Sequence, residues 1–69
     1  LEFRRVLFRS PAGVEVFVID GACTANDINM AQYDWMRLPA HSTLSLRSRE
    51  GLVLYVKLGA VTSLRAVNG

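Results

Sequence analysis

The chain has 69 residues, of which 51% are apolar and 20% are charged. This length allows one small domain with a limited core, and the composition excludes a disordered chain. A single cysteine, Cys23, excludes an internal disulfide and a zinc site built from cysteines. No apolar run approaches the roughly 18 residues of a membrane helix. We therefore expect a cytoplasmic domain in a reducing compartment, with no membrane partner.

The net charge of +2 originates in the first ten residues. Three of the eight basic residues and one of the six acidic residues lie there, so residues 11–69 carry five of each. Val6–Ser10 is similar to a translated sequencing adapter. We interpret residues 1–10 as a non-native segment and exclude them from the fold prediction; the alternative is an amphipathic N-terminal strand or helix turn. Without that charge, nothing favours a nucleic-acid partner.

The first half of the remaining chain reads as a turn, a strand and an irregular stretch. Residues 11–13 contain proline and glycine and predict a turn. Residues 14–20, VEVFVID, are mostly β-branched or aromatic and predict a strand. Both of its faces are largely apolar, which indicates a sheet covered on both sides. Residues 20–21 predict a turn, residues 23–24 a short strand and residues 26–27 a loop tip.

Alternation of apolar and polar residues predicts the other strands, which span residues 31–38, 43–48, 52–58 and 61–67. It places Leu44 and Leu46 on one face of residues 43–48, and in residues 52–58 it places the leucines and Val56 inward and Tyr55 and Lys57 outward. Pro39 ends the first of these because it offers no donor to a ladder. Turns at residues 40–42 and 49–51 and a break at Gly59 separate the others. No useful helical period appears, and short strands with turns every eight to twelve residues indicate a sandwich or barrel. The fold class is therefore all-β.

Several motifs of this pattern resemble the cupin family. EVFVIDG at Glu15–Gly21 is similar to the strand and turn that close the first cupin motif. The second half of a ChrR-type anti-sigma-factor cupin resembles three motifs of this chain: Trp35-x-Arg37-x-Pro39, Ser48-x-x-Gly51 and Leu54–Lys57. The resemblance covers nearly all of residues 13–58. It implies that residues 11–69 are part of a cupin domain: a partial jelly-roll barrel of antiparallel strands, without its N-terminal strands.

The mouth of a cupin barrel often holds a metal, bound by an HxH pair, a glutamate and a distant histidine. Imidazole and carboxylate ligands together suit zinc, iron or manganese. The resemblance would place the HxH pair just before Pro11, where this chain has Phe-Arg-Ser. It places the distant histidine at Leu44, and it aligns Glu15 with the carboxylate in the four-residue spacing variant. The site would therefore be degenerate here, with those metals possible only in a longer protein.

Glu15 and His41 are the remaining metal candidates. His41 lies three residues from Leu44, and an odd shift turns a strand residue to the opposite face. A solvated turn histidine is the alternative for His41. Glu15 could instead pair with Arg37 or Arg65 across a sheet, because an unpaired buried carboxylate is costly.

The residues expected to line the cup's pocket are Phe17, Trp35, Arg37, Leu44 and Leu54. Leu44 reads most simply as core, and Trp35 and Tyr33 as barrel packing or a ligand platform. Arg37 could bind an anion at the barrel mouth, or form an ion pair with Asp34 or Asp20. Cys23 has no neighbouring base in the sequence, which favours a buried thiol over a nucleophile.

Three functions are consistent with this pattern, and the first is favoured. The chain could be a non-catalytic sensory or regulatory module of an anti-sigma-factor-like transcriptional regulator, with a small-molecule ligand and a sigma factor reached through another domain. It could instead be a truncated cupin metalloenzyme of the dioxygenase or isomerase type. The third alternative is a structural half-barrel that forms homodimers through an exposed sheet edge.

Overall fold

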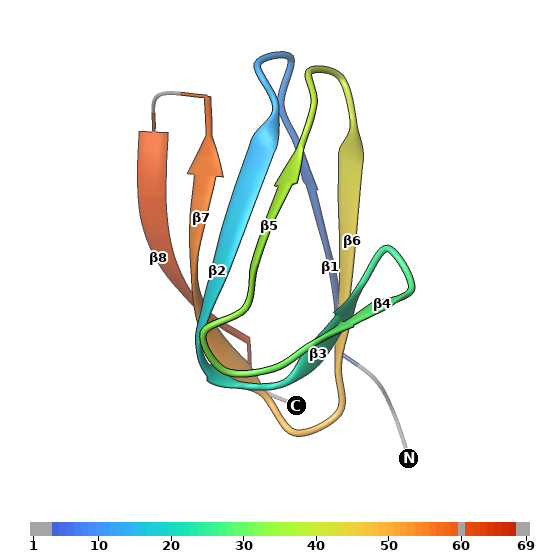
Figure 1. The fold of residues 1–69 in the computed structure, drawn as a ribbon, viewed down its shortest axis with the longest axis vertical. Coiled ribbons are helices and arrows are strands. Elements are labelled where there is room, and N and C mark those ends of the chain that lie inside the picture. Colours follow the sequence, from blue (N-terminus) through green and yellow to red (C-terminus); the bar gives the residue numbers. More distant parts are fainter. Residues whose placement is uncertain (1–3, 60, 68–69) are drawn as a thin grey trace.

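The computed structural model describes residues 4–59 and 61–67, which form eight strands in two four-stranded antiparallel sheets (Figure 1). The first sheet has the order β1-β6-β3-β4 and contains β1 (Arg4–Arg9), β3 (Cys23–Ala25), β4 (Ile28–Met30) and β6 (Thr43–Ser48). The second has the order β5-β2-β7-β8 and contains β2 (Val14–Gly21), β5 (Trp35–Leu38), β7 (Leu52–Leu58) and β8 (Val61–Val67). The all-β prediction is confirmed.

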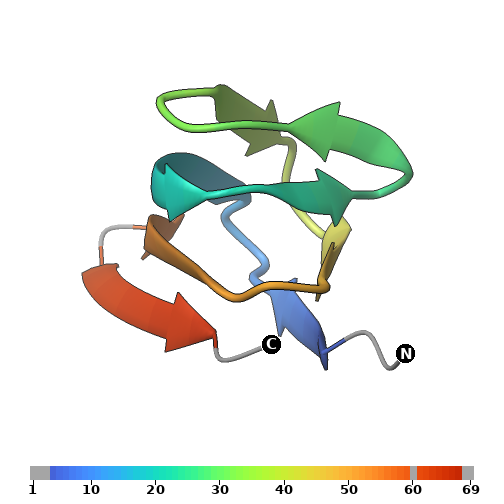
Figure 2. The same cartoon turned by 90° about the horizontal axis from the view of Figure 1, so that it is seen from below.

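The two sheets lie face to face, and the chain passes between them repeatedly (Figure 2). Among the eight described strands, only β3–β4 and β7–β8 are hairpins within one sheet; the other five connections cross from one sheet to the other. Such crossings are typical of a partial β-sandwich or jelly roll. Both sheets keep open edges, at β1, β4, β5 and β8, so the described strands do not close into a barrel.

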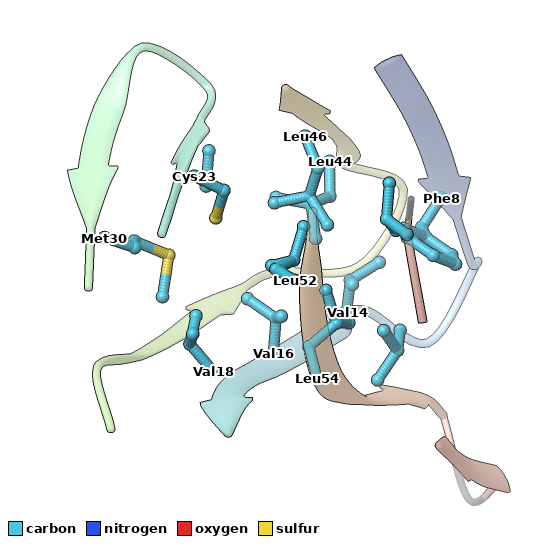
Figure 3. Packing of buried hydrophobic residues seen from close by; sticks show 13 residues of the cluster. Phe8, Val14, Val16, Val18, Cys23, Met30, Leu44, Leu46, Leu52 and Leu54 are labelled. Carbon is cyan, nitrogen blue, oxygen red and sulfur yellow. The ribbon is translucent and has the colours of Figure 1, made fainter. Parts of the chain in front are cut away.

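The core lies between the sheets and is built from the inward-facing side chains of both (Figure 3). Alternation buries every second residue of β6, of β2 as far as Val18 and of β7 as far as Val56, as expected where one face of an antiparallel sheet is covered. The largest fully buried apolar side chains are those of Val14, Val16, Val18, Leu44, Leu46, Leu54 and Val56. Hydrophobic burial of this set supplies most of the favourable free energy of folding.

The N-terminal segment takes part in this fold. β1 pairs with β6 through six consecutive residue pairs, from Arg4 opposite Ser48 to Arg9 opposite Thr43. Phe8 belongs to the core cluster. Excluding residues 1–10 from the fold was therefore wrong for residues 4–9, because the alternation of Val6 and Phe8 matches the β6 register. The origin of the segment stays a prediction, and residues 1–3 lie outside the described part of the chain.

The predicted turn at residues 20–21 is wrong, since β2 continues through Gly21. The register against β7 shifts between Val18 and Asp20, which marks a β-bulge. Gly21 has φ of 93°, and a Cβ atom there would lie 2.6 Å from the carbonyl oxygen of Gly51. Asp-Gly therefore serves here to bend a strand against its neighbour, a role that the sequence pattern does not distinguish from a hairpin turn.

The strand predicted at residues 31–38 begins only at Trp35. Residues 31–34 form a turn in which the Asp34 amide donates to the Ala31 carbonyl at 3.0 Å. The Asp34 carboxylate accepts from the Ala31 amide at 2.9 Å, and Tyr33 has φ of 70°. An aspartate that closes its own turn offers the backbone an alternative to a ladder, which alternation alone does not reveal.

The prediction that β2 lies in a sheet covered on both sides is also wrong. Its inward residues are buried, but Glu15, Phe17 and Ile19 on the other face stay partly exposed. No described strand covers that face.

None of the described residues belong to a helix that is long and apolar enough to cross a membrane.

Candidate binding face on the second sheet

The five residues expected to line one pocket lie in two separate places: the core between the sheets and the outer face of the second sheet. Leu44 and Leu54 are 0% exposed and pack between the sheets. Phe17, Trp35 and Arg37 share the outer face of β2 and β5. The prediction of a common pocket is therefore wrong, although the periodicity of each strand was correct. The resemblance implies a hollow cup between the sheets, but aliphatic side chains fill that space.

The metal candidates do not come together into a metal site. Glu15 lies on the outer face of β2, where its Oε1 atom is 3.6 Å from Nε of Arg37. His41 is exposed in the β5–β6 turn, with φ of 66°, and its backbone amide donates to the Ser10 carbonyl at 3.2 Å. Among the described residues, no group of three or more histidine, cysteine, aspartate or glutamate side chains could hold a metal ion.

The Glu15–Arg37 pair confirms one alternative and corrects another. A cross-strand partner for Glu15 was expected at Arg37 or Arg65, and Arg37 is that partner. The expected pairing of Arg37 with Asp34 or Asp20 is wrong, because antiparallel register places Glu15 directly opposite. Arg37 is largely exposed, so this pair contributes at most about 1 kcal/mol to stability.

An apolar row runs straight across the outer face of the second sheet. Antiparallel register places Trp35 opposite Phe17, Phe17 opposite Tyr55, and Tyr55 opposite Leu64. Each residue of the row comes from a different strand. With strands about 4.8 Å apart, the row extends over about 14 Å. Trp35 is 58% exposed and Leu64 61% exposed, so the row presents aromatic and aliphatic surface to solvent instead of packing a core.

A polar row lies beside the apolar one. It consists of Arg37, Glu15, Lys57 and Thr62, again one residue from each strand in direct register. Together the two rows border a shallow depression of about 350 Å³, lined by Glu15, Phe17, Trp35, Tyr55, Lys57 and Thr62. Its size and its mainly apolar lining with a few polar groups are those of small-molecule sites.

Lys57 is the charged group available at this depression. Its side chain is exposed, and within the described part of the chain its ammonium makes no ion pair. Glu15 stands opposite Lys57 in the register but makes its ion pair with Arg37 instead. As far as the described residues show, the polar row therefore offers one positive charge without an ion pair beside the aromatic row.

Tyr33 adds an aromatic ring at the margin of the face. It stacks on Phe17 with ring centroids 6.2 Å apart and 15° between the planes. The Tyr33 amide donates to the Val18 carbonyl at 2.7 Å, and the Val18 amide donates to the Asp34 carbonyl at 3.0 Å. These bonds dock the turn against β2, so Phe17 is supported from the side and keeps its position in the row.

A second depression lies at the end of the first sheet and is lined in part by Cys23, Met30, Asp34 and Glu50. Cys23 is a buried free thiol, as the sequence indicated. Burial raises the pKa of this thiol, and the negative charge of Asp34 raises it further. A raised pKa keeps the group protonated and poorly nucleophilic, which argues against Cys23 as a nucleophile in this depression.

Residues Tyr55, Lys57 and Leu64 belong to the candidate face but were not among the predicted site residues. Alternation did predict that Tyr55 and Lys57 point outward. Their place beside Trp35 depends on the strand order β5-β2-β7-β8, which joins segments far apart in the sequence.

Comparisons of this chain with protein-family models, with curated proteins and with solved structures find no match.

Proposed function

We propose that this chain is a non-catalytic sensory or regulatory module of the cupin type, and that it binds its ligand on the outer face of the second sheet. The observation that carries the proposal is the outward-facing row of Trp35, Phe17, Tyr55 and Leu64, placed in direct register across four strands, with all but Phe17 largely exposed. Rings held rigidly on strands form a binding surface at low entropic cost.

The chemistry of the face favours a small ligand with a flat ring and a negative charge. Aromatic side chains bind flat rings by stacking or by edge-to-face contact. The Lys57 ammonium is a charge-assisted hydrogen-bond donor for a carboxylate at the edge of the same depression. Glu15 is already engaged by Arg37, which lowers its repulsion of an anion. The ligand class is therefore an aromatic carboxylate.

In the regulatory form of this proposal, binding is coupled to another domain. The resemblance to ChrR-type anti-sigma factors supports a partner that contacts a sigma factor, with the present module as the sensing part. The burial of Leu44 in the core supports a non-catalytic module. The resemblance implies a metal-binding histidine at this position, whereas here the residue is a leucine that packs between the sheets.

Trp35 provides a direct test because it is the only tryptophan in the chain. Titration with benzoate should change Trp35 fluorescence in a saturable manner. Benzyl alcohol lacks the charge and cyclohexanecarboxylate lacks the flat ring, so both should bind at least about tenfold more weakly if charge and ring each contribute about 1.4 kcal/mol. Equal binding of all three compounds would show that the face does not recognise an aromatic anion.

Two matched variants locate the site. Lys57→Gln should weaken benzoate binding, whereas Arg47→Gln, an equivalent loss of exposed charge on the outer face of the first sheet, should leave it unchanged. Tyr55→Ala should weaken binding of benzoate and benzyl alcohol alike. If Arg47→Gln weakens binding as much as Lys57→Gln does, the ligand is attracted by general charge and the proposed site is wrong.

A further inference from the structure

The two sheets have four open edges, and three of them are poorly suited to pairing with another strand. β4 has three residues, and β5 has four and is followed by Pro39. β1 carries the exposed arginines Arg5 and Arg9. Short strands, prolines and charged side chains are the usual protection against edge-to-edge association.

β8 has fewer of these protections. It has seven residues, VTSLRAV, which contain no proline or glycine and only one charged side chain, that of Arg65. It pairs with β7 over its full length, and among the described strands it has no neighbour on its other side. The Arg65 guanidinium lies 6.0 Å from the ring centroid of Phe8, which is a core residue of the first sheet. The one charge of the strand is thus directed toward the first sheet, and this inward-pointing charge is the only feature of β8 that opposes edge pairing.

The sequence of β8 allows it to pair with its own copy. In an antiparallel pair with a two-fold axis at Leu64, all seven residues overlap, from Val61 opposite Val67 onward. Arg65 then faces Ser63, and Thr62 faces Ala66, so no like charges are opposed. Moving the axis by one residue to Arg65 would place two arginines face to face, which is unfavourable.

We propose that β8 pairs antiparallel with β8 of a second copy of this chain, with the axis at Leu64, so that the two second sheets join into one sheet of eight strands. The pair adds about six to eight backbone hydrogen bonds. It also brings two Leu64 side chains together on the outer face. Because Leu64 ends the apolar row of each copy, the two rows become one continuous row with Trp35 at each end.

For two copies of this chain, pairing through the β8 edges is favoured over stacking of their outer faces. Face-to-face stacking would bury Lys57 and the Glu15–Arg37 pair against apolar rings, at a desolvation cost that nothing on the face compensates. Edge pairing leaves both faces open. It is therefore compatible with ligand binding on them, and it does not depend on that binding.

The test is the association state of the chain without ligand, measured by sedimentation velocity up to about 500 µM, since a single strand pair is a small interface. We expect a reversible monomer–dimer equilibrium. Leu64→Lys places two like charges opposite each other and should raise the dimer dissociation constant at least tenfold. Leu7→Lys is the matched control, because Leu7 is 58% exposed on the outer face of the first sheet, and it should leave the constant unchanged.

A charge exchange tests the register itself. The double variant Thr62→Lys with Ala66→Lys should be monomeric, and so should Thr62→Glu with Ala66→Glu, because each opposes like charges across the axis. An equimolar mixture of the two should form a heterodimer. Thermal melts confirm that each variant is folded; both positions are exposed.

Three results would overturn the proposal. If the wild-type chain stays monomeric at about 500 µM, β8 does not pair with its own copy, and its edge is open to another protein or to solvent. Equal effects of Leu64→Lys and Leu7→Lys would place the contact elsewhere. A mixture of the two double variants that stays monomeric would exclude the register centred on Leu64. None of these results bears on benzoate binding, which is measured separately by Trp35 fluorescence.

Discussion

The rings of Phe17 and Tyr33 stack, with 6.2 Å between their centroids and 15° between their planes. Phe17 lies in β2, whereas Tyr33 lies in a turn where its own φ of 70° is uncommon for an aromatic residue. The stack therefore opposes a local backbone strain. It also joins the turn to the sheet whose outer face carries the candidate site.

Substitutions at Tyr33 separate these two contributions. Tyr33→Ala should lower the free energy of unfolding by about 1 kcal/mol, because the stack is lost while a positive φ persists. Tyr33→Gly also loses the stack but removes the strain, so it should be at least as stable as Tyr33→Ala. Tyr33→Phe should match the wild type. Urea unfolding measures all three, and a glycine variant clearly less stable than the alanine variant would contradict the strain.

Leu44 should be among the most costly positions at which to shorten a side chain. Leu44→Ala removes fully buried methyl groups and should cost about 3 kcal/mol. That is a large part of the roughly 3–10 kcal/mol expected for a chain of this size. Leu7→Ala, the same change at an exposed strand position, should cost less than about 0.5 kcal/mol. Comparable losses in thermal or urea unfolding would show that Leu44 is not in the core.

Gly21 should not tolerate a side chain. Gly21→Ala should cost at least about 2 kcal/mol, because φ is 93° and the new Cβ would approach the Gly51 carbonyl oxygen to 2.6 Å. Gly59→Ala is the control: its φ is 64° and the nearest atom, Cβ of Ala12, is 3.2 Å away. It should cost about 1 kcal/mol. Equal costs would indicate that the bulge in β2 relaxes around the substitution.

Cys23 should make stability depend on pH under alkaline conditions. Its pKa is raised in the folded chain by burial and by Asp34, so the folded state favours the thiol over the thiolate. The stabilisation is fully present below about pH 8.5, the ordinary thiol pKa, and is lost as pH rises through the folded-state pKa. In Cys23→Ala this loss should be absent. Melting temperatures of both proteins between pH 7 and pH 10 test this, and parallel curves would contradict it.

The local pattern of the sequence determined much of the strand structure. Alternation in residues 43–48 and 52–58 correctly predicted which side chains point inward, because the side-chain period of a strand follows from its backbone. The same alternation was present in residues 4–9, and only their separate interpretation kept them out of the predicted fold. Turns at residues 11–13, 40–42 and 49–51 were correct because proline and glycine restrict or permit backbone angles locally.

Only the tertiary structure decided which strands are neighbours and which face is covered. Trp35, Phe17, Tyr55 and Leu64 are up to 47 positions apart in the chain, and they form one row through pairings set by the packing of two sheets. A strand's period states that two residues share a face, but not what covers that face. Leu44 and Trp35 were thus both expected in one pocket, whereas the sandwich buries the first and exposes the second.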